Sequence, residues 1–80
     1  MNIYLLTQTE IGGYDTYDSC VVCAENEEAA SKILPSQHSS WEREPWRMWA
    51  SRPENVTVKL IGVAADGVEP GVVLASFNAG

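Results

Sequence analysis

One short segment, residues 39–53 (SSWEREPWRMWASRP), holds the side chains best suited to binding chemistry. It contains all three tryptophans of the chain and three of its five basic residues, Arg43, Arg47 and Arg52. Tryptophan, arginine and tyrosine are the residues most enriched at binding hot spots. A guanidinium binds phosphate or carboxylate with a planar fork, and an indole offers a face on which a base can stack. The segment therefore predicts a surface or pocket wall for a nucleotide-like anion.

The predicted ligand-binding residues come from this segment and from the first long loop, residues 9–18. The loop carries two tyrosines that can add stacking or a hydroxyl donor. The predicted set is Tyr14, Tyr17, Trp46, Arg47, Trp49 and Arg52. The sequence leaves open whether the two loops converge at one end of a sheet or across a subunit boundary. The alternative interpretation is that at least two of the tryptophans are core residues and that the arginines form surface salt bridges.

No other group of residues predicts catalysis or a metal site. His38 is the one histidine and lies in a Ser-rich stretch, so neither a Ser-His-Asp site nor a histidine metal cluster is expected. Cys20 and Cys23 have CxxC spacing but lie in a β-branched run, where residues three apart point to opposite faces. We expect two buried free cysteines, no metal, no cofactor and no enzymatic activity.

The charge balance is acidic, with eleven carboxylates against five basic side chains and a net charge of −6. Such a surface repels the nucleic-acid backbone, so duplex nucleic acid is not an expected partner. The charge is still compatible with a compact anion held by local arginines, or with docking on a basic protein that normally holds nucleic acid. Because no apolar run approaches the ~20 residues of a membrane span, we expect a soluble, cytosolic protein that does not bind membranes.

Residues 1–80 are expected to form a single α+β domain. Asn26 is a favoured N-cap, and Pro35 is expected to end the helix that follows it. Strands are predicted over 2–8, 19–25, 55–64 and 72–77, and a short helix over 27–34. The order ββαββ implies a four-stranded, mainly antiparallel sheet whose first two strands form a hairpin with a wide loop. A long connection over 35–54 carries the tryptophan and arginine residues.

One short helix can cover only one face of this sheet. The residues expected to need cover on the other face are Cys20, Val22, Val73 and Ala75. An exposed apolar sheet face is unfavourable, so the tryptophan segment or a second subunit must supply that cover. This predicts a homo-oligomer.

Three stretches, YLLTQTEIGGYDTYDSCVVCAENEEAASKI, WASRPENVTVKLIG and GVVLASFNAG, together resemble small accessory proteins of bacteriophages and prophages. The resemblance covers nearly the whole chain, with residues 36–47 as the least similar part. It implies a compact, non-catalytic protein acting in the cytoplasm of the infected bacterial host. Some phage proteins of this kind resemble sponges that sequester nucleotide immune signals, and others resemble anti-CRISPR proteins that block an effector directly.

The leading hypothesis is therefore an anti-defence sponge that binds an anionic, nucleotide-derived immune signal. The first alternative is an acidic inhibitor that binds a host defence protein in place of nucleic acid. The second alternative is a minor protein of the virion.

Overall fold

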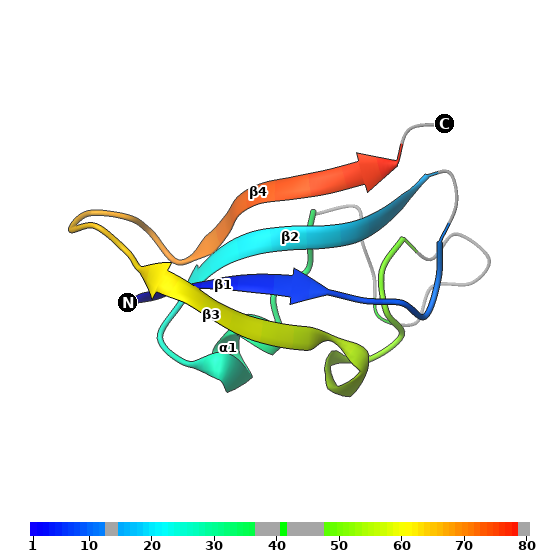
Figure 1. Ribbon diagram of the computed structural model, residues 1–80, viewed down its shortest axis with the longest axis horizontal. Helices are drawn as coiled ribbons and strands as arrows, with labels where there is room; N and C mark the ends of the chain where they lie inside the picture. The colour runs from blue at the N-terminus through cyan, green and yellow to red at the C-terminus, as the bar shows by residue number, and fades with distance from the viewer. Residues whose placement is uncertain (13–14, 37–40, 42–47, 79–80) are drawn as a thin grey trace.

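A computed structural model of the chain describes residues 1–12, 15–36, 41 and 48–78, and four strands form its body. The strands are β1 (Asn2–Thr7), β2 (Thr16–Ala24), β3 (Thr57–Val63) and β4 (Gly71–Asn78). They lie in the order β3-β1-β2-β4, and every neighbouring pair is antiparallel (Figure 1). The predicted antiparallel sheet with one short helix is confirmed, as is the hairpin of the first two strands.

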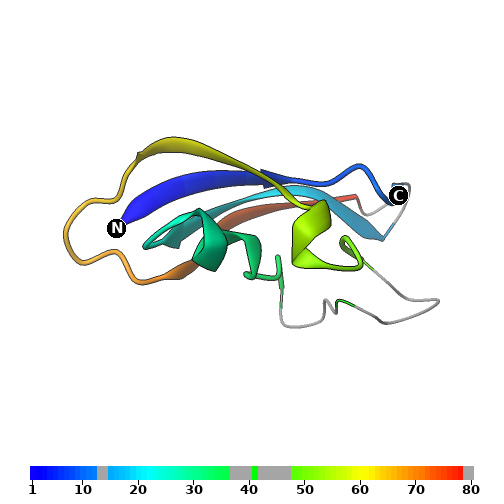
Figure 2. The ribbon, with the colours of Figure 1, turned by 90° about the horizontal axis from the view of Figure 1, so that it is seen from below.

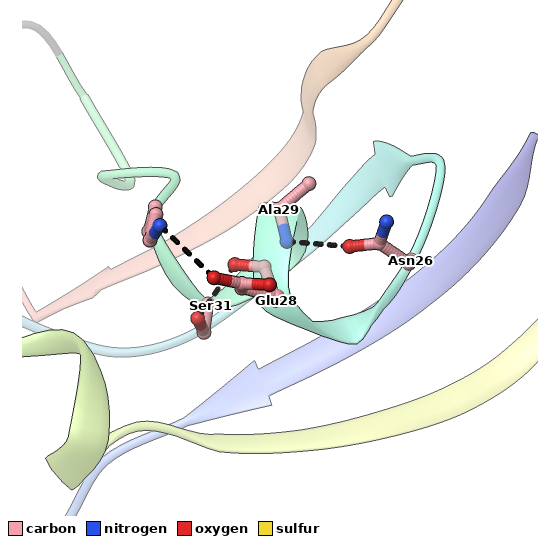
Figure 3. A network of polar contacts seen from close by, with 5 residues as sticks. Asn26, Glu28, Ala29 and Ser31 are labelled. Carbon is pink, nitrogen blue, oxygen red and sulfur yellow. Dashed lines mark hydrogen bonds and ion pairs between the residues drawn. The ribbon is translucent and has the colours of Figure 1, made fainter.

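The helix α1 (Glu27–Ser31) follows β2 directly and begins as the sequence predicts. The Asn26 side chain caps it, because its Oδ1 accepts a hydrogen bond of 2.8 Å from the backbone N–H of Ala29 (Figure 3). Two glutamates occupy the first turn, where the helix dipole favours negative charge. Glu28 also forms an ion pair with Lys32, with 3.4 Å between Oε1 and Nζ. These local contacts hold a helix that is too short to be stable by itself.

The predicted C-terminal boundary of the helix, residue 34, is wrong. The helix ends at Ser31, and the backbone N–H groups of Lys32 and Ile33 bond to the carbonyls three residues before them. Pro35 disfavours helical backbone in Leu34, the residue before it, and the chain leaves the helix three residues earlier than that. Ile33 and Leu34 still pack against the core from the turn that follows.

The core lies between the sheet and the segments on one side of it (Figure 2). Alternate residues of the two central strands point to that side, as the period of a strand requires. The strand residues in the core are Tyr4, Leu6, Cys20, Val22 and Ala24, and the covering residues are Ala30, Trp49, Ala50 and Val56. The helix and the segment around Trp49 therefore share the task of covering one face.

The prediction that Cys20, Val22 and Ala75 need cover on the far face is wrong. Cys20 and Val22 lie in the core beside the helix, and Ala75 pairs with Cys20 and packs on the same side. The reason is the direction that the chain takes after β2. Ala24, the last residue of β2, lies on the same face as Cys20 and Val22, and it is buried where the chain continues into α1. Val73 lies at a register shift between β2 and β4.

A different set of residues faces the side without described cover. We call it the open face, because no described helix or connection lies over it (Figure 2). Register and strand alternation place the following residues on it: Ile3, Leu5, Thr7, Ser19, Val21, Thr57, Lys59, Leu74 and Ser76.

The strand predicted from residue 55 begins two residues later, at Thr57. A short 3-10 helix, η1 (Pro53–Asn55), precedes it, and the N–H of Val56 donates to the carbonyl of Pro53. Proline suits the first turn of a helix because its missing N–H would have no partner there. Val56, just before β3, is buried and Val58 packs against the core, whereas Leu60 further along this edge strand is 54% exposed.

Candidate functional site

The two loops that carry the predicted binding residues meet at one end of the sheet, within one chain. The backbone N–H of Tyr17 donates to the carbonyl of Met48 over 2.8 Å. Glu10 connects the first loop to the second, because its Oε2 accepts from the Ser51 N–H at 3.1 Å and from Asn55 Nδ2 at 2.9 Å. We call this region the loop end; its described residues are 8–12, 15–18, 48–56 and 76–78 (Figure 1).

The buried side chain of Gln8 fixes the conformation of the first loop. Its side chain is 5% exposed, and its Nε2 donates to the carbonyls of Ile11 and Tyr17 at 2.9 and 2.8 Å. Its Oε1 accepts from the N–H of Ile11 at 3.0 Å. The side-chain amide thus uses both its N–H donors and its oxygen acceptor to hold the loop. These hydrogen bonds replace those that the buried amide would otherwise make with water.

Tyr17 and Phe77 form an aromatic pair at the loop end. They are opposite each other on β2 and β4, with ring centroids 4.9 Å apart and planes inclined by 51°. Tyr17 is half-buried against the core, and Phe77 is 41% exposed. Phe77 was not among the predicted residues. Its pairing with Tyr17 depends on β4 lying beside β2, which no local pattern in the sequence specifies.

Trp49 is not a surface residue. It is completely buried in the core, so the predicted role as an exposed stacking face does not fit its position, and the alternative of core packing holds for it. Trp41 is half-buried and also packs against the core. The indole Nε1 of Trp49 is buried and has no hydrogen-bond partner among the residues that the structure describes.

Arg52 is exposed and lies directly before η1 on the segment that Glu10 holds. It is the predicted guanidinium that the structure places at the loop end. The other predicted residues, Tyr14, Trp46 and Arg47, lie outside the described residues. The described side chains of this end can thus stack on a ring, bind an anion and exchange hydrogen bonds.

The two cysteines are free and buried, as predicted, and they lie on opposite faces of β2. Burial raises the pKa of the Cys20 thiol to about 11. A thiol that stays protonated is a poor nucleophile. Within the described ranges, no three histidine, cysteine or acidic side chains come close enough to share a metal ion. None of the described helices has the length and apolar character needed to span a membrane.

The raised pKa of Cys20 predicts that the protein loses stability in alkaline solution. An unfolded cysteine titrates near 9, so between pH 9 and 11 the unfolded state releases a proton that the folded state keeps. The free energy of unfolding should therefore fall by about 2 to 3 kcal/mol across that interval, at ~1.36 kcal/mol for each pKa unit. Urea unfolding at pH 8, 9, 10 and 11 measures it. Cys20→Ala should remove this part of the pH dependence, and an equal slope in both proteins would contradict the prediction.

No protein-family model, curated protein or solved structure matches this chain.

Proposed function

We propose that this protein is a non-catalytic phage accessory protein that captures a small anionic, nucleotide-derived signal of a host defence system. It would act as a sponge in the cytoplasm of the infected bacterium. The observation that carries the proposal is the junction at the loop end, where Tyr17 bonds to Met48 and Glu10 bonds to Ser51 and Asn55. The junction brings an aromatic residue and a segment with an exposed arginine together from distant parts of the sequence.

The chemistry of the loop end suits a nucleotide better than a simple anion. An aromatic ring that is partly exposed, as Phe77 is, gives a base a surface on which to stack. The Arg52 guanidinium can hold a phosphate through two parallel hydrogen bonds. In the sequence, Trp46 and Arg47 immediately precede Met48, the residue at the junction. Binding without turnover fits the buried cysteines, of which Cys20 has a raised thiol pKa.

Replacing Arg52 with glutamine should weaken binding of the signal at least tenfold. The substitution removes a charge-assisted contact to phosphate but disturbs no core residue, because Arg52 is exposed. Isothermal titration calorimetry with a panel of cyclic dinucleotides and ADP-ribose derivatives measures it. Lys32→Gln is the matched control: it removes one exposed positive charge from α1, where Lys32 pairs only with Glu28 among the described contacts, and should leave the affinity unchanged within twofold.

Two results would contradict the sponge proposal. One is an absence of binding to every compound of the panel by protein that circular dichroism shows to be folded. The other is an equal loss of affinity in the Arg52 and Lys32 variants, which would mean that net charge, and not the loop end, attracts the ligand.

A second candidate, an acidic inhibitor of a host defence protein, is favoured by the opposite end of the sheet. The exposed carboxylates there come from the residues after β2 and from the turn between β3 and β4, which the sheet register brings to the same end (Figure 1). They are Glu25, Glu27, Glu28, Asp66 and Glu69. A partner pulled from host lysate that dissociates as salt is raised, together with a silent calorimetry panel, would favour this candidate.

A further inference from the structure

The residues of the open face are sorted into rows that run across the sheet. One row crosses all four strands as Lys59, Leu5, Val21 and Leu74, each opposite its neighbour. The next row consists of hydroxyl side chains alone: Thr57, Thr7, Ser19 and Ser76. On the other side of the first row, Ile3 and Cys23 pair in the two central strands between two glycines. Apolar and hydroxyl groups are therefore separated along the strands and not mixed.

The aliphatic row of this face is partly open to solvent, although Cys23 beside it is completely buried. Leu74 is 69% exposed, and the half-buried Leu5 and Val21 lie beside it in the same row. All covering segments among the described residues lie on the other side of the sheet (Figure 2). A continuous apolar patch of this kind on a small protein marks an interaction site.

The distribution of charge indicates what covers the face. The four strands contain one of the chain's eleven carboxylates, Asp18, which lies at a register shift on β2 beyond the row of hydroxyls. Two copies with a net charge of −6 each repel one another over most of their surfaces. The sheet is where two copies can approach without bringing carboxylates together.

We propose that a second copy of this chain packs its open face on the first, forming a two-fold sandwich of two sheets. With the two-fold axis parallel to the strands, β1 lies over β2 of the partner subunit and β3 over its β4. Each row then lies over the same row of the partner subunit, with the order of the strands reversed. Leu5 therefore faces Val21 of the partner subunit. Hydroxyls face hydroxyls, which suits identical partners because a hydroxyl is both donor and acceptor.

The one charged residue of these rows, Lys59, fits the same arrangement. Lys59 lies on the edge strand β3, so its aliphatic stem can cover Leu74 of the partner subunit while its ammonium group reaches water. Aligned sheets pack about 10 Å apart at about −30°, a geometry that places such edge residues at the rim. No charge has to be buried.

The size of the molecule is compatible with a dimer interface on this face. The molecule measures 38 by 24 Å across its two longer axes, and the sheet lies roughly in that plane (Figure 1). This outline is an upper limit for the area that a facing copy can cover, and it is close to the ~800 Å² per partner of a standard protein–protein interface. The proposal does not depend on the ligand site, which lies at one end of the sheet and shares only Ser76 with the open face.

Replacing Leu74 with glutamate tests the dimer. Sedimentation equilibrium of the full chain should give the wild-type protein a mass of about 18 kDa, twice the 8.8 kDa of one chain. Leu74→Glu places a carboxylate against the partner and should raise the dissociation constant at least tenfold. Leu60→Glu is the matched control: it changes an exposed leucine on the other edge strand, opposite Tyr4 and therefore on the core side of the sheet. It should leave the dimer intact.

Both leucines are exposed, so neither variant is expected to unfold, and circular dichroism verifies this. A wild-type protein that remains monomeric at 100 μM, on the order of the concentrations at which weak dimers form, would overturn the proposal. So would a dimer that survives Leu74→Glu, or one that Leu60→Glu disrupts equally, since either result places the interface elsewhere.

Discussion

Replacing Trp49 with alanine is expected to lower the free energy of unfolding by about 3 to 5 kcal/mol, the range for loss of a large buried aromatic side chain. Trp49 is the largest of the completely buried side chains and closes the core from the side opposite the sheet. An 80-residue protein has a total stability of only about 4 to 12 kcal/mol, so much of the variant should be unfolded at 37 °C. Urea unfolding followed by circular dichroism measures the effect.

Two further variants make this prediction specific to Trp49. Trp41→Ala should have a smaller effect, about 1 to 2 kcal/mol, because Trp41 is only partly buried against the same core. Trp49→Phe should also be mild, since it keeps an aromatic ring and the indole N–H that it removes has no hydrogen-bond partner within the described part of the chain. A loss at Trp49 no larger than that at Trp41 would show that Trp49 does not close the core.

Gln8→Met should lower the free energy of unfolding by about 3 kcal/mol and loosen the first loop. Methionine keeps the shape of the side chain but removes all three hydrogen bonds to Ile11 and Tyr17, leaving buried or partly buried backbone groups unpaired. Urea unfolding gives the stability, and hydrogen exchange should show that the Ile11 amide loses protection. If the loop end binds the ligand, affinity should fall as well, because Tyr17 is then less firmly positioned.

The neighbouring residue provides the control for Gln8. Thr9→Ala changes an exposed side chain in the same loop and should alter stability by no more than about 0.5 kcal/mol. A Gln8→Met variant as stable as Thr9→Ala would mean that the loop keeps its shape without the buried amide.

Local signals in the sequence were enough to predict the sheet and the start of the helix. Asn26 and the two glutamates after it define a helix N-terminus by short-range hydrogen bonding and charge. In the structure Asn26 caps the helix and both glutamates lie in its first turn. The predicted helix C-terminus at residue 34 is wrong because Ile33 and Leu34 continue the spacing of a helical face, whereas the structure places them in a turn before Pro35. Those two residues reach the core from a turn, which periodicity does not distinguish from a helix.

The assignment of faces and of the site required long-range information. Alternation in β2 shows that Cys20 and Val22 share a face, but not that the chain returns on that side with α1 and Trp49. Likewise, tryptophan at a binding surface and tryptophan in a core have the same sequence signature. Only the tertiary packing distinguishes them, and for Trp49 it favours the core. The meeting of the two loops depends on Glu10, whose partners lie more than 40 residues away.

The two thiols of β2 can report separately on the exposure of the two sides of this strand. Cys20 lies in the core between the sheet and the segments that cover it, whereas Cys23 lies on the opposite side of the strand and is buried as well, at 0% exposed. Pulsed alkylation followed by mass spectrometry can therefore compare, on one strand, how fast each of its two sides opens to solvent. If the rate at Cys23 alone slows as protein concentration rises, that side is being shielded by association.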